Sequence, residues 1–350
     1  MHRRPLLQRL DPPSVVVFRA RRLRGMLCAV PALRALRAAL PHARIALVGL
    51  PEAQPFAQRF RSYVDEFIAF PGHPLRSGQP IRHNALAAFH AAIRARRFVL
   101  ALQLHGGGDA GNDIVDGFGA HAMAGFCRGA AVVRDRTVLF PFPDTGTEPE
   151  RLLWLMDQLG AQAIGTHLEF PLSQQDEDEW RASGLDSTLV PGTYVCLHPG
   201  ARGRGTCWPA ALFAEVGDCL ADEFGLRVVL SGSADEADLT AAVAERMRYM
   251  PLDAAGRTSL GTLAVLLRGA RLLLCNDSGV SQLAAGLGVD SVVVFNRADI
   301  ARWAPFDRHR HRCIWDPAAE RAHVALHHAR ALLSGTVPSR QRSVGMWPYW

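Results

Sequence analysis

The chain of 350 residues contains no lysine, so all 39 of its basic residues are arginine. Its seven cysteines form no Cys-x-x-Cys pair and sit mostly in apolar stretches, which indicates free thiols rather than a zinc site or a disulfide framework. No apolar run approaches the roughly 18 residues that would span a bilayer. The basic N-terminus lacks the apolar core of a signal peptide. These absences lead us to expect a protein of the reducing cytoplasm.

The arginines are distributed unevenly along the chain. Residues 1–175 carry 21 arginines against 13 acidic residues, a net charge of +8, and residues 176–350 carry 18 against 20, a net charge of −2, which together give +6. A coding bias toward arginine explains the missing lysine but not this asymmetry. A positive N-terminal half suits an anionic partner, such as a phosphorylated acceptor or an acidic lipid surface. Nucleic acid is not expected, because the chain has no recognisable nucleic-acid-binding module.

Short apolar segments alternate with amphipathic ones in both halves of the chain. The expected strands are 15–18, 45–48, 98–102, 194–197, 227–230, 271–275 and 291–295, and the expected helices are 31–40, 52–62, 84–96, 210–223, 235–248, 259–268 and one from about 280. Strands that alternate with helices are typical of parallel, doubly wound α/β sheets. Polar residues 173–179 and the loop 191–193 mark a boundary region. We therefore predict an N-terminal domain of residues 1–175, a C-terminal domain of residues 176–336 and a tail of residues 337–350.

Three loops of the second half follow strands whose carboxyl ends should share one edge of the sheet, where ligands bind in such folds. The loop 198–209 is rich in glycine and carries Arg202 and Arg204, which suit phosphate. The loop 231–236 ends in a carboxylate that could accept hydrogen bonds from a ribose, or that simply favours a helix N-terminus. The turn 277–279 leaves amide groups unpaired at a helix start, which suits phosphate unless it is only a plain helix cap. Together the three loops predict a nucleotide diphosphate site.

These segments resemble glycosyltransferase family 9, the ADP-heptose:lipopolysaccharide heptosyltransferases. The blocks that carry the resemblance are 31–36, His198-Pro199-Gly200-Ala201 with Trp208-Pro209, Gly232 with Glu236, Ala255-Gly256-Arg257-Thr258-Ser259-Leu260, Asn276-Asp277-Ser278-Gly279 and Arg302-Trp303-Ala304-Pro305. The resemblance covers most of the chain. It implies a GT-B fold of two Rossmann-like domains, with an acceptor-binding N-terminal domain, a donor-binding C-terminal domain and a tail that crosses back to the first.

The resemblance also implies an activity, which is inverting transfer of a heptose-like sugar from a nucleotide diphosphate donor, by family ADP-heptose, without a metal ion or another cofactor. The implied acceptor is lipopolysaccharide or another anionic glycan or lipid-linked sugar, reached in the cytoplasm or at the inner membrane surface. By resemblance the Asp277 turn holds the donor pyrophosphate, Glu236 binds the ribose and residues 256–260 lie beside the base. The expected donor-binding residues are Gly200, Arg202, Arg204, Thr206, Gly232, Glu236, Thr258, Asp277, Ser278, Gly279 and Gln282.

The chain departs from the family pattern at several functional positions. Arg24 and Gly25 stand where the family has Gly-Asp, whose aspartate is the expected general base, and glycine cannot accept a proton. Thr206 replaces a lysine or arginine two residues before the tryptophan, and Arg204 is its candidate substitute. Gln282 replaces a histidine that usually follows the phosphate turn.

The catalytic base is therefore unassigned by the sequence. His105 and Asp109, in a glycine-rich loop after a strand of the first half, are the candidates, although residues in such a loop often only shape a turn. Two functions stay open: an active heptosyltransferase with an altered base, or a catalytically silent relative that binds a nucleotide-sugar without turnover. A nucleotide-sugar epimerase of the same architecture fits the Arg-Trp-Ala-Pro and Asn-Asp-Ser-Gly blocks less well.

Overall fold

The computed structural model describes residues 4–72, 83–201 and 203–335, so the predicted tail 337–350 and Arg202 lie outside the described residues. We call the part from α1 to α7 the N-domain. Its strands are β1 (Ser14–Phe18), β2 (Arg44–Gly49), β3 (Glu66–Ala69), β4 (Leu100–Gln103), β5 (Ala122–Cys127), β6 (Val132–Val133) and β7 (Thr137–Pro141). Its helices are α1 (Leu6–Leu10), α2 (Leu23–Leu27), α3 (Val30–Ala39), η1 (Pro51–Ala53), α4 (Gln54–Arg59), α5 (His83–Ala95), α6 (Asp109–Asp116) and α7 (Glu148–Leu159).

We call the part from α8 to α14 the C-domain. Its strands are β8 (Tyr194–His198), β9 (Arg227–Leu230), β10 (Leu252–Asp253), β11 (Leu273–Asn276), β12 (Ser291–Phe295) and β13 (His311–Trp315). Its helices are α8 (Gln174–Ala182), η2 (Arg204–Thr206), α9 (Ala210–Phe224), η3 (Ala234–Glu236), α10 (Ala237–Ala244), α11 (Leu260–Gly269), α12 (Gly279–Leu287), α13 (Ile300–Trp303) and α14 (Ala322–Leu333).

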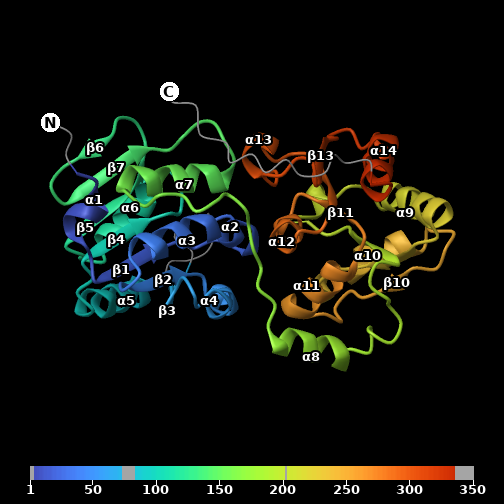
Figure 1. The fold of residues 1–350 in the computed structure, drawn as a ribbon, viewed down its shortest axis with the longest axis horizontal. Coiled ribbons are helices and arrows are strands. Elements are labelled where there is room, and N and C mark those ends of the chain that lie inside the picture. Colours follow the sequence, from blue (N-terminus) through green and yellow to red (C-terminus); the bar gives the residue numbers. More distant parts are fainter. Residues whose placement is uncertain (1–3, 73–82, 202, 336–350) are drawn as a thin grey trace.

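Each domain is built on one sheet, and the two domains lie side by side (Figure 1). The N-domain sheet has the order β3-β2-β1-β4-β5-β7-β6 and the C-domain sheet the order β10-β9-β8-β11-β12-β13. The described pairs are parallel except β6 with β7. This confirms the predicted GT-B class, whereas the residue limits of the domains stay a prediction.

The central strands are buried on both faces, as expected for parallel sheets covered by helices. Residues 15–18 of β1 and 194–197 of β8 are almost wholly inaccessible to solvent. All of the predicted strands are present within a few residues of their expected limits. One predicted helix, 235–248, is wrong in extent, because the chain first makes the short turn η3 and α10 then ends at Ala244. None of the described helices is both long and apolar enough to cross a bilayer.

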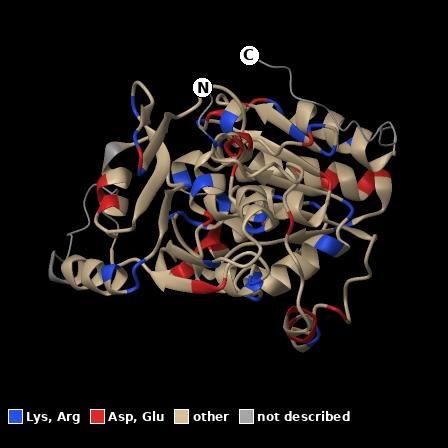
Figure 2. Ribbon diagram, turned by 60° about the vertical axis from the view of Figure 1, so that its left-hand side comes forward, with Lys and Arg blue, Asp and Glu red and all other residues tan. Residues whose placement is uncertain are grey.

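Helix α8 occupies the polar boundary stretch, and its succession of acidic residues stands out in red at the lower edge of Figure 2. It packs on α11 of the C-domain, yet it is tied to the N-domain through one carboxylate. Arg59 on α4 donates to the Asp176 oxygens at 2.5 and 2.7 Å, and the Ser173 amide donates at 2.7 Å. Burial alone would raise the pKa of Asp176, but the hydrogen bonds from Arg59 and Ser173 outweigh it and lower that pKa to about 2.

Stability should therefore depend on the ionisation of Asp176. Its pKa in the folded protein is depressed below the ordinary value of 3.8, so the stabilisation is present above pH 3.8 and is lost as the pH falls toward 2. The shift corresponds to about 2 kcal/mol. We would measure the free energies of unfolding of wild type and Asp176→Asn in urea from pH 2 to 7. We expect the two values to differ near neutral pH and to converge as the pH falls to 2. The exposed neighbour Asp178 supplies the control Asp178→Asn, and a constant difference between wild type and Asp176→Asn at all pH values would contradict this reading.

Candidate active site

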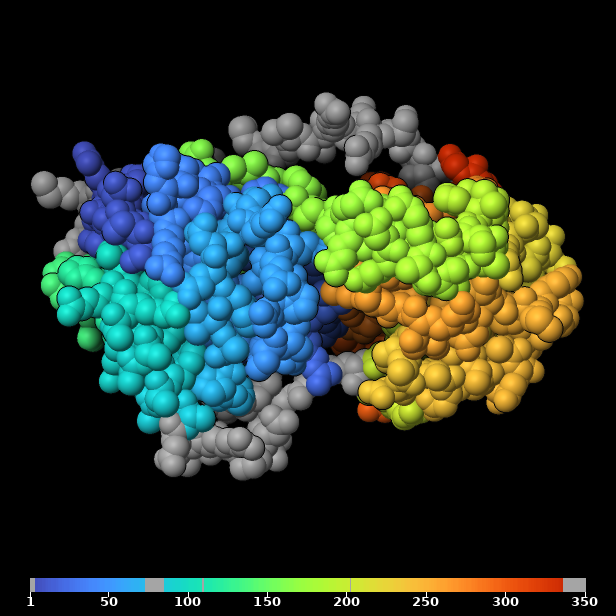
Figure 3. Space-filling view, turned by 90° about the horizontal axis from the view of Figure 1, so that it is seen from below, coloured from blue at the N-terminus to red at the C-terminus, as the bar shows by residue number. Residues whose placement is uncertain are grey.

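A cavity of about 1160 Å³ lies between the two domains and is lined by both. Figure 3 shows the domains as two lobes, blue to cyan and yellow-green to orange, that lie against each other. The N-domain contributes residues 20–25, the glycine-rich loop after β4, and residues around 128 and 142. The C-domain contributes the loops after β8, β9 and β11, together with Arg302 and Trp303. Five arginines line the cavity against three carboxylates: Arg21, Arg22, Arg24, Arg128 and Arg302, and Asp144, Glu236 and Asp277.

The three predicted C-domain loops open on one edge of the sheet, because β9, β8 and β11 are adjacent and parallel. The buried Asn276 side chain holds two of these loops together. Its Oδ1 accepts from the Trp208 amide at 2.9 Å, and its Nδ2 donates to the Pro199 carbonyl at 2.7 Å. Asn276 thus fixes the β8 loop against the turn that follows β11.

The turn after β11 presents the start of α12 to the cavity. Ser278 is the N-cap, and its Oγ accepts from the Val280 amide at 3.2 Å. A Cβ at Gly279 would lie 3.2 Å from Leu23, so glycine allows the N-domain helix α2 to approach this turn closely. The remaining amides and the positive end of the helix dipole favour an anion at this place.

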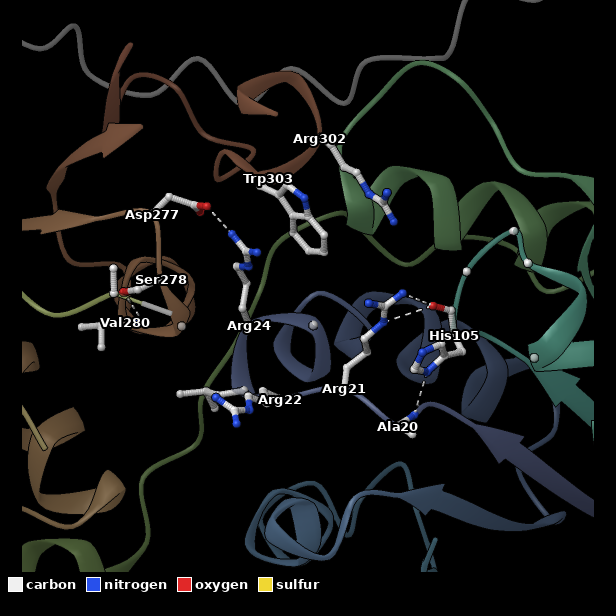
Figure 4. A pocket seen from close by; sticks show the side chains of 18 of the residues that line it. Ala20, Arg21, Arg22, Arg24, His105, Asp277, Ser278, Val280, Arg302 and Trp303 are labelled. Carbon is white, nitrogen blue, oxygen red and sulfur yellow. Dashed lines mark hydrogen bonds and ion pairs between the residues drawn. The ribbon is translucent and has the colours of Figure 1, made fainter. Parts of the chain in front are cut away.

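Asp277 in this turn is paired across the domains. Its Oδ2 accepts from Arg24 Nη1, whereas its buried Oδ1 has no hydrogen-bond partner among the described residues. Burial raises the pKa of the Asp277 carboxyl, and the charge of Arg24 offsets only part of that effect. The Arg24 guanidinium also lies 4.1 Å from the centroid of the Trp303 ring (Figure 4).

Glu236 lines the cavity from the loop after β9. Its Oε2 accepts from the Ser233 amide at 2.8 Å and from the Ser233 hydroxyl at 2.9 Å. The carboxylate rests against Gly200, where a Cβ would displace it from its present position. His198 lies close by, with its Nδ1 3.2 Å from the Ser231 hydroxyl. Burial lowers the pKa of His198 despite the opposing charge of Glu236, so this imidazole is neutral at pH 7.

The structure brings together only part of the expected donor-binding set. The members that line the cavity are Gly232, Glu236, Thr258, Asp277, Ser278 and Gly279, whereas Gly200, Arg204, Thr206 and Gln282 are outside its lining. Arg204 is exposed and pairs with Asp238, so its expected role as a substitute cation in the cavity is not supported. The Thr206 hydroxyl donates to Gly203, and the buried Gln282 amide donates to the Trp303 carbonyl.

His105 lines the cavity, but its ring is engaged. Its Nδ1 accepts from the Ala20 amide at 3.1 Å, and the ring stacks on Phe18 with centroids 5.4 Å apart. A neutral imidazole whose Nδ1 accepts this hydrogen bond carries its proton on Nε2. The ring could then take up a second proton only at Nδ1, and only if the hydrogen bond from Ala20 were broken. This geometry disfavours His105 as a general base. Asp109 begins α6, and its side chain lies outside what the structure describes, so its candidacy stays a prediction.

Gly25, at the expected base position, is held by its neighbours. Its carbonyl accepts from Arg19 Nε at 2.6 Å, and a Cβ added to it would lie only 2.7 Å from the Cβ of Arg21. Arg21 in turn donates to the His105 carbonyl. The packing of α2 thus favours glycine over the expected aspartate at position 25.

Any side chain at position 25 should therefore destabilise the protein. We expect Gly25→Ala and Gly25→Asp each to cost about 1–3 kcal/mol in urea unfolding, because the new Cβ overlaps Arg21. The alanine variant is also the control for activity, since it shares the steric cost but has no carboxylate. A gain of turnover in Gly25→Asp alone would mean that the other groups of the site are competent. If Gly25→Ala were as stable as wild type, the packing argument would be wrong.

Sequence reasoning missed a buried charge network behind the cavity. Arg19, directly after β1, is fully buried, and its Nη2 donates to Glu148 Oε1 at 3.0 Å. Glu148, at the start of α7, also accepts from Arg302 Nε of the C-domain at 2.8 Å. The Arg302 guanidinium lies 5.0 Å from the Phe142 ring centroid and 4.9 Å from that of Trp303. Only the Arg302 block had a signal in the sequence, because Arg19 and Glu148 belong to no recognisable motif.

Three further cavity residues of the N-domain had no sequence signal. Arg22 and Arg128 are exposed, and their side chains make no ion pair or hydrogen bond with the described part of the chain. Asp144, after β7, is also exposed, and its carboxylate likewise makes no such contact with described residues. Each sits in a polar loop whose place in the fold the sequence does not reveal.

The comparisons with known proteins agree with this architecture. Crystal structures similar to the chain include the family 9 glycosyltransferase from Veillonella parvula (19% identity, TM-score 0.76, covering 92% of this chain and 97% of that one). E. coli ADP-heptose LPS heptosyltransferase II is also similar, with 20% identity, a TM-score of 0.69 and coverage of 92% of this chain and 99% of that one. For E. coli heptosyltransferase WaaC with ADP the identity is 18% and the TM-score 0.67, over 92% of this chain and 99% of that one. At these identities the likeness shows the fold. A search of curated proteins gave no match. Because the model of glycosyltransferase family 9 (heptosyltransferase) matches residues 150–327, just over half of the sequence, the chain belongs to that glycosyltransferase family.

Proposed function

We propose that the protein is an inverting heptosyltransferase that moves a heptose-like sugar from ADP-heptose to an anionic glycan or lipid-linked acceptor. The observation that carries the proposal is the convergence of three C-domain loops and a basic N-domain surface on one cavity. The helix start at Ser278 suits the donor diphosphate, and Glu236 suits the ribose hydroxyls. E. coli WaaC, which has the same fold, has been crystallised with ADP and with ADP-2-deoxy-2-fluoro heptose.

The N-domain side of the cavity suits the acceptor. Arg22 and Arg128 are exposed arginines that line it and make no ion pair with described residues, so both are available to an anionic group. A phosphorylated sugar or a sugar acid on a lipid carrier has this charge. Contact with the inner membrane surface would follow if the acceptor is anchored there.

Asp144 is the best-placed general base in this proposal. Four other proton acceptors line the cavity, and each is engaged. Asp277 is paired with Arg24, Glu236 accepts from Ser233, His105 is bonded to Ala20, and the buried His198 contacts the Ser231 hydroxyl. The Asp144 carboxylate comes from the N-domain, on the side proposed for the acceptor. In the reaction it would take the proton of the acceptor hydroxyl while that oxygen bonds to the anomeric carbon and the bond to the diphosphate breaks. By resemblance the transfer needs no metal ion and no cofactor.

The alternative is a silent relative that binds a nucleotide-sugar without turnover. The observation in its favour is the pair Arg24 and Gly25, which replaces the expected base and is fixed by packing.

Release of ADP from ADP-heptose separates the two functions. We would incubate the full chain with the donor and with a panel of acceptors, namely phosphorylated or sugar-acid glycans with and without a lipid anchor. Turnover with inversion at the anomeric carbon, read by NMR of the product, would support the transferase. Binding of ADP-heptose without release of ADP with any acceptor would support the silent binder. Failure to bind either ADP or ADP-heptose in calorimetry would contradict both.

A further inference from the structure

Arg24 belongs to the N-domain but reaches the C-domain part of the cavity. Figure 4 shows its side chain extending from α2 toward Asp277, with Trp303 beside it. The helices α2 and α12 pack directly against each other across the domain boundary. The close approach of Leu23 to Gly279, which a Cβ would crowd at 3.2 Å, fixes the distance between them. The position of Arg24 over the turn is therefore set by helix packing.

Among its described residues, the C-domain offers this turn little positive charge of its own. Arg204 is directed to Asp238 outside the cavity, and Arg302 is paired with the buried Glu148. Within the described part of the chain, Arg24 is the arginine that contacts the turn of residues 277–279. The cation that contacts this turn therefore comes from the N-domain.

We infer that Arg24 binds the diphosphate of the donor from the N-domain side and neutralises it as the sugar departs, an inference that rests on the proposed function. The Asp277 carboxylate is the anion that Arg24 contacts in the structure, and a phosphate oxygen is an equivalent acceptor for guanidinium. The Trp303 face holds the guanidinium in place by a cation–π contact.

Arg24 can readily exchange its ion pair with Asp277 for one with a phosphate of the donor. The Asp277 side chain is only 9% exposed, and its Oδ1 lacks a hydrogen-bond partner among the described residues, so the carboxylate is poorly compensated as an ion. A diphosphate carries more charge and several free oxygens, and the amides at the start of α12 can bind it at the same time. Arg24 can then turn from the carboxylate to the phosphate with little movement of α2.

The chemical step shows where this charge would act. The acceptor oxygen bonds to the anomeric carbon, its proton passes to the base, and the bond from that carbon to the diphosphate oxygen breaks. The bonding electron pair stays on the diphosphate, so negative charge grows there. A fixed cation next to that oxygen lowers the barrier. An arginine next to the position where the family has its base would thus serve the leaving group instead of the nucleophile.

The test compares ADP with adenosine, which has no phosphate. In calorimetry of the full chain, Arg24→Gln should weaken ADP binding about 10- to 100-fold, the range for hydrogen bonds to a charged group, and should leave adenosine binding unchanged. Arg24→Lys keeps the charge but loses the planar fork, and should lie between wild type and Arg24→Gln. The control is Arg61→Gln, which removes the same charge from an exposed N-domain arginine outside the cavity.

Each other outcome overturns the inference. Equal losses of ADP and adenosine affinity would mean that Arg24 only holds the domains together, and tighter ADP binding in Arg24→Gln would mean that its pair with Asp277 blocks the site. An unchanged ADP affinity in Arg24→Gln and Arg24→Lys, with wild-type ADP release intact, would remove the role of Arg24 and leave the proposed function standing. Wild-type protein that binds no ADP would instead remove both.

Discussion

Replacing Glu148 by glutamine should lower the free energy of unfolding by about 3–5 kcal/mol, the usual cost of leaving a buried charge without its partner. Glu148 and Arg19 are both fully buried, and their side chains are paired at 3.0 Å. Burial alone would raise the pKa of Glu148, but the guanidiniums of Arg19 and Arg302 hold it below its ordinary value, so the carboxylate is ionised. The amide of glutamine would leave the Arg19 charge with carbonyl acceptors only, those of Gly25 and Leu104.

A double replacement tests whether the loss comes from the unpaired charge. If it does, Arg19→Met combined with Glu148→Gln should be clearly more stable than Glu148→Gln alone, because no charge is then stranded in the core. Urea unfolding followed by circular dichroism gives the three free energies. The control is Asp157→Asn, an exposed carboxylate on the same helix. A loss below about 1 kcal/mol in Glu148→Gln would contradict the argument, since ordinary surface substitutions stay within about 0.5 kcal/mol.

The arrangement of the two sheets could be predicted from the sequence because their strands are short, apolar and buried on both faces. Residues 15–18, 194–197 and 292–295 are continuous apolar runs, and the structure places each in a strand that has a neighbour on both sides. The helix α7 was missed although its capping box, Thr147 with Glu150, is a recognisable N-terminal signal. The strands β3, β5, β6, β7, β10 and β13 were also missed. For β3 and β6 the reason is that half-exposed residues give no clear alternation.

The site could be predicted only where its residues follow a strand of the C-domain. Topology alone places the loops after β8, β9 and β11 on one edge, so the cavity positions of Glu236 and Asp277 were accessible to reasoning. The direction in which a side chain points could not be predicted in this way. Arg204 was expected in the cavity and turns to Asp238, because a nearby surface carboxylate competes for it. Arg24 reaches the cavity from the other domain, and no local pattern could have revealed its contact with a residue 253 positions away.

Replacing Asp144 by asparagine should lower kcat about 10²–10⁴-fold, the typical contribution of a positioned general base. The side chain is exposed and makes no hydrogen bond or ion pair with described residues, so the substitution removes the proton acceptor without disturbing the fold. Binding of ADP should be unchanged, because the proposed donor contacts are the C-domain loops and Arg24, and Asp144 makes no hydrogen bond or ion pair with the described residues of either. Kinetics of ADP release and calorimetry of ADP binding would separate these two effects, with Asp157→Asn as the control for loss of a carboxylate outside the cavity.

Azide gives a sharper test of the same role, because it is a nucleophile that needs no deprotonation. If Asp144 acts only as the base, azide should restore release of ADP from ADP-heptose in Asp144→Asn and form an inverted glycosyl azide. A residue that merely shaped the acceptor site would not show this rescue. A fall in kcat of less than about tenfold would be too small for a general base and would return the choice to the silent binder or to another base. Loss of ADP binding in Asp144→Asn would equally overturn the assignment, since it would place the carboxylate with the donor.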